Sequence, residues 1–254
     1  MNLIQVIGID CATDWSRIGV AFGRVIAGKI TIEVMEPAST DALAQIISLN
    51  LAKGKKILLA LDAPLGWPSA LGQNLAEHQA GAVISIEANK LFRRDTDEFV
   101  RARIGKQSLD VGADRIARTA LSTLKIISEL EKVVSQAIPL VWEANFSENI
   151  GCIEVYPAAT LKAYGLPNTG YKKNTANELE QRKIILEELS PRLAFAGDSE
   201  NVLLGRDHDF DATLCVLAAY DFLQDNCYFP TDLKLAQKEG WIWVRNKENN
   251  HSRH

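Results

Sequence analysis

The sequence is poor in cysteine and has no long apolar run. Its four cysteines, Cys11, Cys152, Cys215 and Cys227, form no Cys-x-x-Cys pair, the spacing that is typical of zinc and dithiol redox sites. The first apolar run is interrupted by Asp10, so we expect neither a signal peptide nor a membrane-spanning segment. These absences favour a cytoplasmic protein with reduced thiols and argue against a disulfide-stabilised or membrane protein.

The sequence also lacks an excess of either charge. Its 28 lysines and arginines and 32 aspartates and glutamates give a formal net charge of -4 at pH 7. A protein that coats nucleic acid through its overall field would be strongly basic, so only a local basic face could do this here. With 254 residues, 47% of them apolar, the chain can bury one large core. No repeat or linker is visible, and we expect a single domain over residues 1–246, followed by a flexible tail over 247–254.

Two short apolar runs each end in an aspartate. Leu3 to Ile9 precedes Asp10, and Ile57 to Leu61 precedes Asp62. Continuous apolar runs of this length are typical of strands that are buried on both faces. Since open α/β sheets bind their ligands at the carboxyl ends of strands, both carboxylates are expected at one edge of the sheet. They would repel each other unless a divalent cation lay between them, although Asp10 alone could equally cap a turn.

The surrounding pattern predicts an α/β protein with a mixed sheet. An antiparallel hairpin and a third strand come first, then a helix, the strand that ends at Asp62, and a helical insertion at about residues 69–140. Later elements follow without a break in composition. They are a strand over 150–156, a loop over 164–174, helices over 177–189 and about 206–223, a loop over 197–207 and an edge strand over 241–244.

The segment from Lys90 to Arg118 carries eight basic and five acidic residues. Two interpretations stay open for it. Charge-rich helices commonly just face solvent, whereas arginine can also hold phosphate oxygens through paired hydrogen bonds. For the second interpretation the candidate substrate-binding residues are Arg93, Arg94, Thr96 and Asp97.

A cluster of acids opens the late helix that runs to about Leu223. The helix dipole favours negative charge at this end, and a cap explains Asp207 or Asp209. Asp211 is less well explained in this way, because small and apolar residues suited to burial follow it. His208 lies three residues before Asp211, so the two share a helix face and are candidates for the same site.

Several short motifs resemble those of an uncharacterised family of predicted nucleases with a ribonuclease H-like fold, domain of unknown function 429. They are Gly-Ile-Asp, Leu-Asp-Ala-Pro-Leu-Gly-Trp-Pro, Arg-x-Thr-Asp, Glu-Val-Tyr-Pro and the Asp-rich helix. His-x-x-Asp-Ala is similar to the last catalytic helix of Holliday-junction resolvases. The resemblance implies that Asp10, Asp62 and Asp211 are metal ligands and that His208 lies near the attacking water. It also marks Glu154, as a further candidate ligand.

We therefore expect a nuclease that hydrolyses DNA or RNA with Mg²⁺ or Mn²⁺. Two ions about 3.5–4 Å apart would share Asp10, with Asp62 and Asp211 on either side, and hard carboxylate oxygens suit these cations. One alternative is an ATP-binding phosphotransferase or ATPase of the actin and sugar-kinase type, because Asp10, Thr13 and Arg17 faintly resemble its first phosphate loop. A catalytically inactive module that binds nucleic acid or protein on the same core is the other alternative.

Overall fold

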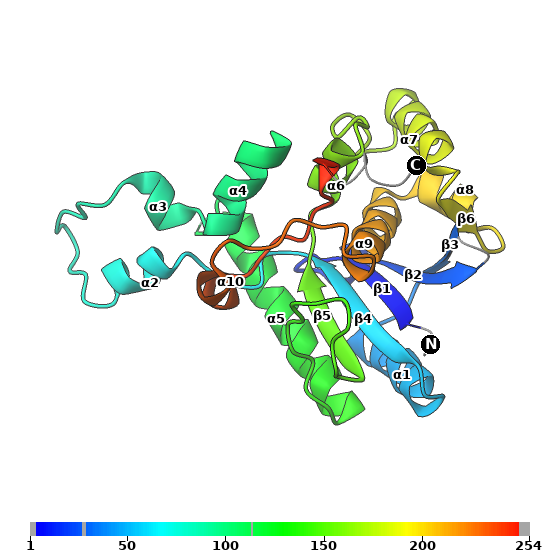
Figure 1. Cartoon of the computed structure of the whole chain (residues 1–254), viewed down its shortest axis with the longest axis horizontal. Coiled ribbons are helices and arrows are strands. Elements are labelled where there is room, and N and C mark those ends of the chain that lie inside the picture. Colours follow the sequence, from blue (N-terminus) through cyan, green and yellow to red (C-terminus); the bar gives the residue numbers. More distant parts are fainter. Residues whose placement is uncertain (1–3, 27–28, 113, 249–254) are drawn as a thin grey trace.

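A six-stranded mixed sheet forms the centre of the computed structural model, which describes residues 4–26, 29–112 and 114–248 (Figure 1). The first three strands of the chain pair with one another in antiparallel directions, and the next two along the chain run parallel to the first. These strand directions confirm the expected mixed sheet and are consistent with a ribonuclease H-like fold. In spatial order the strands are β5 (Ile150–Glu154), β4 (Lys56–Asp62), β1 (Ile4–Asp10), β2 (Gly19–Ile26), β3 (Lys29–Met35) and the short β6 (Leu193–Phe195), which is parallel to β3.

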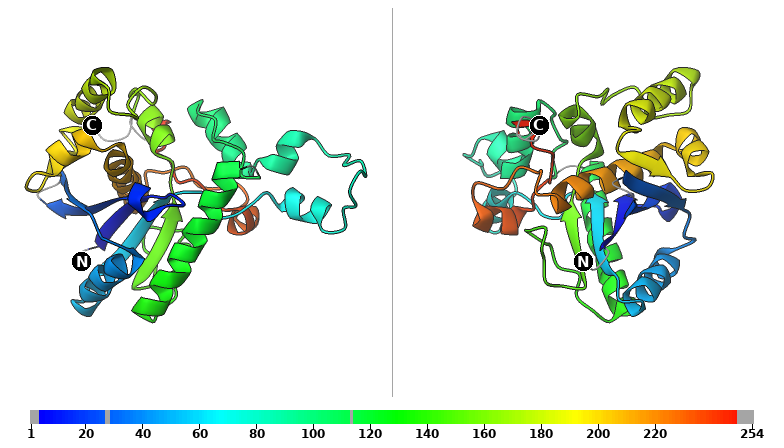
Figure 2. Two further views of the ribbon diagram at one scale, coloured as in Figure 1. Left: turned by 180° about the vertical axis from the view of Figure 1, so that it is seen from behind. Right: turned by 45° about the vertical axis from the view of Figure 1, so that its right-hand side comes forward.

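The central strands are buried on both faces because helices cover the sheet on both sides (Figure 2). In β1, Ile7 and Ile9 pack with one layer of helices, while Val6 packs with the other. The first layer consists of α1 (Thr40–Ala52) and α5 (Asp114–Val134). The second contains α9 (Asp207–Leu223), together with α6 (Pro157–Ala163), α7 (Ala176–Leu189) and α8 (Ser199–Gly205).

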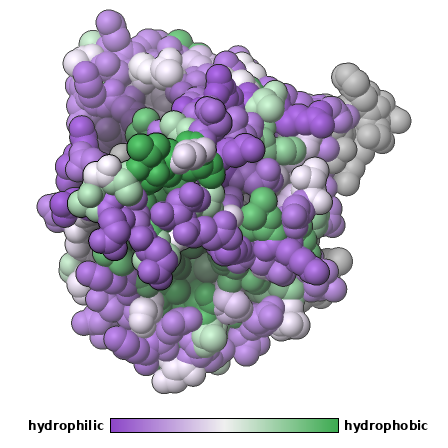
Figure 3. Space-filling model, turned by 90° about the vertical axis from the view of Figure 1, so that its left-hand side faces the viewer, coloured by the Kyte–Doolittle hydropathy of each residue, from purple (hydrophilic) through white to green (hydrophobic). Residues whose placement is uncertain are grey.

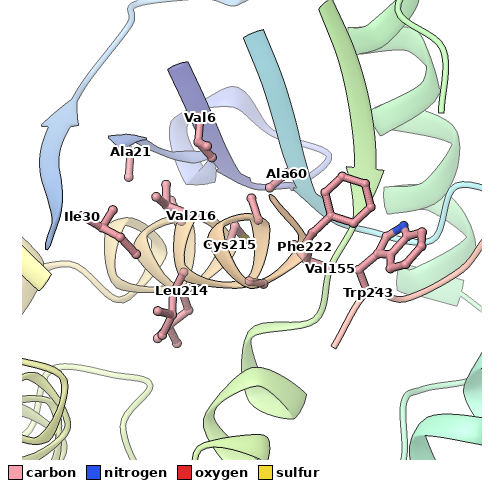
Figure 4. Packing of buried hydrophobic residues seen from close by; sticks show 14 of the residues in the cluster. Val6, Ala21, Ile30, Ala60, Val155, Leu214, Cys215, Val216, Phe222 and Trp243 are labelled. Carbon is pink, nitrogen blue, oxygen red and sulfur yellow. The ribbon is translucent and has the colours of Figure 1, made fainter. Parts of the chain in front are cut away.

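Helix α9 lies directly against the backbone of the sheet, because the strands have glycines at the positions that the helix crosses. A Cβ atom on Gly8 of β1 would overlap the carbonyl oxygen of Ala212, and one on Gly19 of β2 would overlap the carbonyl oxygen of His208. Figure 4 shows the apolar side chains that fill the rest of this interface, with Val216 of α9 facing the strands. The first turns of α9 are thereby held against the carboxyl end of β1.

The helical insertion is confirmed. It contains α2 (Ser69–Leu75), α3 (Ala88–Phe92), α4 (Asp95–Ile104) and the long α5, and its first two helices project from the body of the molecule (Figures 1 and 2). Figure 3 shows this side, where apolar surface is interspersed among hydrophilic surface. Large apolar side chains exposed on the insertion before α5 are Leu75, Val83, Phe92 and Leu109.

Some expected elements differ from the structure. Residues 197–207, expected as a loop, contain α8, and residues 241–244 form no strand but a single bridge from Ile242 to Glu154. Strand β5 ends at Glu154 because α6 begins at Pro157, where the fixed φ of proline suits the first turn of a helix. A further short helix, α10 (Leu233–Glu239), precedes this bridge. Residues 249–254 of the expected tail lie outside the described residues.

The described helices were also compared with the length and hydropathy that a bilayer crossing requires. Within residues 4–26, 29–112 and 114–248, no helix meets both requirements.

We predict that Gly19→Ala destabilises the protein, because the added methyl group pushes the backbone of His208 away from β2. Overpacking of this kind costs about 1–3 kcal/mol in the free energy of unfolding, measurable by urea denaturation. Gly72→Ala is the matched control: its Cβ meets no atom within 4 Å, and alanine in a helix should stabilise by about 0.5–1 kcal/mol. Equal stability of Gly19→Ala and the wild type would contradict the proposed contact.

Candidate metal centre

Three aspartates from different parts of the chain meet at the carboxyl edge of the sheet. β1 and β4 are parallel neighbours whose last residues, Asp10 and Asp62, are directly paired. Helix α9 adds Asp211 from above the same edge. One carboxylate oxygen from each aspartate lies within 4.8 Å of those from the other two, and Asp211 is buried while the others are half-buried. The structure thus brings together the three aspartates that the strand-end argument and the late helix singled out.

This grouping raises the pKa of two of the three carboxyls. Loss of solvent contact, followed by repulsion from Asp10 and Asp211, raises the pKa of Asp62 well above its usual range. Burial also raises the pKa of Asp211 to about 6, against the opposing effect of Lys172. These carboxyls therefore retain protons more readily than free ones, and a cation that replaces the protons would stabilise all three carboxylates together.

Two consecutive residues of the loop between α6 and α7 contact Asp211. The hydroxyl of Tyr171 donates to Oδ1 at 2.9 Å, and Nζ of Lys172 lies 2.5 Å from Oδ2. Tyr171 is buried, and burial together with Asp211 raises the pKa of its phenol, so it remains a donor. The side chain of Lys172 is 57% exposed. Its ammonium group neutralises part of the charge of Asp211, and part of the side chain remains exposed to solvent.

His208 contacts Asp10 from the first turn of α9. Its Nδ1 lies 2.9 Å from Oδ2 of Asp10, and its Nε2 lies 3.9 Å from Oδ1 of Asp207. A carboxylate accepts, so Nδ1 carries the proton of this hydrogen bond. The hydrogen bond to Asp10 raises the pKa of His208. The ring is one-third exposed, so Nε2 is the nitrogen available to a water molecule.

A cavity of about 280 Å³ opens beside the aspartates. Asp10, Asp62, Tyr156 and Lys172 are among the residues that line it. A larger cavity of about 460 Å³ lies at the opposite end of the strands, between α1, α5 and residues 147–149. Its lining contains no acidic, histidine or cysteine side chain, so its size alone does not make it a candidate for chemistry.

Glu154, which the resemblance marked as a ligand, is not part of the aspartate cluster. Its two oxygens accept from the guanidinium of Arg94 at 2.7 and 2.8 Å, and Oε2 also accepts from the backbone N–H of Leu65 at 3.0 Å. Both side chains are buried. Since Leu65 follows Asp62 by three residues, Glu154 fixes the loop that leaves the site, and its carboxylate is already occupied.

The candidate substrate-binding residues Arg94, Thr96 and Asp97 are all buried. Asp97 accepts from Arg94 and from the hydroxyl of Ser108, and Thr96 accepts from the backbone N–H of Ile242 at 2.8 Å. These three residues connect α4 to the sheet and to the C-terminal segment, instead of facing solvent. Arg93 is partly exposed, but it pairs with Glu98 and Asp110.

The roles of Tyr171, Lys172 and Glu239 cannot be predicted from local sequence pattern. The pattern around Tyr171 and Lys172 predicts only a polar loop, because their contact with Asp211 depends on the path of that loop. Glu239 accepts from the backbone N–H of Ser69 and of Asp95, and its carbonyl accepts from Arg94. Glu239 has charged residues near it in the sequence, so the local pattern does not indicate that it is buried.

Comparison with protein-family models matches residues 8–234 to a family described as Protein of unknown function (DUF429). This match covers most of the chain. Neither the curated proteins nor the solved structures gave a match.

We predict that Arg94→Met destabilises the protein strongly, because it leaves Glu154 and Asp97 buried without their partner. The expected loss is about 3–5 kcal/mol in the free energy of unfolding. Arg93→Met, whose ion pairs are partly exposed, is the control and should cost about 0–1 kcal/mol. If both variants unfold at the same denaturant concentration, the network around Arg94 does not have the structural role assigned to it.

We also predict that the affinity for Mn²⁺ rises with pH through the region near 6, in which Asp211 loses its proton. A metal must displace the protons that the raised pKa values of Asp62 and Asp211 retain, so affinity should increase by at least about tenfold per pH unit below 6. The folded carboxyl holds its proton more tightly than the unfolded one. The free energy of unfolding of the metal-free protein should therefore fall as the pH rises from about 4 to about 6. Calorimetric titration checks the first expectation, and a flat affinity from pH 5 to 7 would refute it.

Proposed function

Because the chain belongs to DUF429, a family of unknown function, we propose its function from the metal centre: metal-dependent hydrolysis of phosphodiester bonds in nucleic acid. The observation that supports this most is the convergence of Asp10, Asp62 and Asp211 to within 4.8 Å. Asp10 and Asp62 end two neighbouring parallel strands, and Asp211 comes from helix α9. A site that only capped turns would not need three carboxylates in contact, since their mutual repulsion costs stability.

The donor set fits Mg²⁺ or Mn²⁺. All three side chains offer carboxylate oxygens, which these hard cations prefer, and no cysteine sulfur contributes to the cluster. Asp10, Asp62 and Asp211 would hold the metal. When bound, the metal would lower the pKa of a water molecule and stabilise the charge that develops on the phosphate.

The other residues of the site have separate tasks. His208 orients the carboxylate of Asp10 through Nδ1, and its Nε2 can accept a proton from a water molecule. Tyr171 fixes Asp211 through a hydrogen bond at 2.9 Å. Lys172 neutralises part of the charge of Asp211 in the metal-free protein. Its ammonium group can turn toward a substrate phosphate once a metal occupies the site.

Two alternatives make different demands on the same residues. An inactive binding module would be favoured by acids that are splayed apart or neutralised by Arg93 or Arg94, whereas both arginines pair with other carboxylates. A phosphotransferase would use the segment after Asp10 to bind ATP. There Asp14 accepts from the backbone N–H of Ser16 at 3.0 Å and caps a short 3₁₀ helix (Trp15–Arg17).

We predict that Asp10→Asn abolishes Mn²⁺-dependent cleavage of oligonucleotides and leaves the fold intact. Removing one charged ligand should lower the rate by on the order of 100-fold or more. Asp41→Asn is the control, because Asp41 is an exposed residue in the first turn of α1. Circular dichroism and a gel-based cleavage assay with labelled DNA and RNA give the two readouts.

Full activity in Asp10→Asn would remove this residue from the site. Saturable ATP binding by a wild-type protein that cleaves neither DNA nor RNA would favour the phosphotransferase instead.

A further inference from the structure

A second cavity adjoins the metal centre on the side of the loop between α6 and α7. It has a volume of about 420 Å³ and shares Tyr156 and Lys172 with the cavity beside the aspartates. Its lining also includes Lys106 and Lys173, from two different parts of the chain. The two cavities thus adjoin at Tyr156 and Lys172, and the ammonium group of Lys172 pairs with Asp211.

The charge in this second cavity is predominantly positive. Three of its lining residues are lysines, and Glu178 is the one acidic residue in its lining. Glu178 accepts from the neutral hydroxyl of Thr175 and keeps its charge near Lys173, and Lys172 pairs with Asp211. Lys106 donates to the backbone and side-chain oxygens of Asn168, at 3.3 and 3.0 Å, which are neutral acceptors. The lining therefore carries more positive than negative charge, and the acceptors that Lys106 contacts in the described part of the chain are neutral.

The loop is held in the conformation that presents these lysines. Arg182, a buried residue of α7, donates to the carbonyl oxygen of Lys173 at 2.9 Å. The backbone N–H of Lys173 donates to Asp207 at 3.3 Å. Lys173 itself adopts a φ of 86°, which is rare for a residue with a side chain. Burial, together with the nearby Lys162 and Lys172, lowers the pKa of Lys106, as crowding of like charges requires.

A further cavity, which adjoins the site through Ser108 and Leu109, has a different charge. It also contains arginines, but Arg93 pairs there with Asp110, and Asp114 lines the same wall beside Arg115. Positive and negative side chains are balanced in it. Of these two cavities, the one lined by Lys106 and Lys173 is therefore the better binding site for an anion.

We propose that the cavity lined by Lys106 and Lys173 binds the substrate phosphate next to the one that is cleaved. This inference rests on the proposed function and makes it more specific, because it places the strand on one side of the metal centre. Lysine ammonium groups bind phosphate as point charges, without reading the base sequence. Lys172, between the two cavities, would lie between the two phosphates.

The test compares binding of fluorescein-labelled oligothymidylate and oligouridylate in Ca²⁺ by fluorescence anisotropy. The variant Lys106→Gln/Lys173→Gln removes the two charges at nearly constant side-chain length. We expect its Kd to rise by about tenfold, and the dependence of log K on log salt to become shallower by about 1 for each lysine. Lys106→Arg/Lys173→Arg keeps both positive charges and should retain wild-type binding. Retained binding in this variant would show that the glutamine variant binds weakly because it lacks the charges.

The matched control is Lys53→Gln/Lys132→Gln, which removes two exposed lysines near the C-terminal ends of α1 and α5. If the Lys106 and Lys173 variant binds as tightly as this control while the wild type cleaves the strand, the phosphate site is wrong and the hydrolysis proposal stands. Weakened binding in a series that never cleaves supports the phosphate site and overturns hydrolysis. Failure of the wild type to bind either strand overturns the phosphate site.

Discussion

Repulsion among three neighbouring carboxylates is the constraint on which this structure depends. The fold places Asp10, Asp62 and Asp211 within reach of one another, and burial together with repulsion from the neighbouring aspartates raises the pKa of Asp62 and Asp211. The neighbouring side chains offset only part of that cost, through Lys172 and His208. A group of like charges that the protein does not neutralise is stable only with a proton or a cation among them, and a divalent cation satisfies all three at once.

The rest of the fold supplies the positions. Parallel pairing of β1 with β4 sets Asp10 beside Asp62, and glycines under α9 let its first turns reach the same edge. The loop that leaves Asp62 is tied by Leu65 to Glu154, which Arg94 holds in the interior. Buried ion pairs contribute little net stability, but they define one arrangement of the surrounding segments. The charged residues before α5 thus fix the loop that follows Asp62, and the lysines of the loop before α7 lie beside the site.

The sequence predicted the parts of this arrangement that local pattern determines. Continuous apolar runs identified β1 and β4, and the residues that end them were placed at one edge by the rule for parallel strands. It missed β6, whose three residues form a strand only because the edge of β3 is open to them, and the short α6 and α8. Arg94 looked like part of a charged surface, because its partner Glu154 lies 60 residues away and its contact at Glu239 lies 145 residues away. Lys172 escaped notice for the same reason: tertiary contacts, not spacing, define its role.

The most direct measurement is anomalous diffraction from crystals of the protein soaked in Mn²⁺. The account predicts manganese peaks in contact with carboxylate oxygens of Asp10, Asp62 and Asp211, with the ammonium group of Lys172 displaced from Asp211. Crystals that show no manganese at these oxygens at saturating concentration and neutral pH, with Lys172 still paired to Asp211, would contradict it.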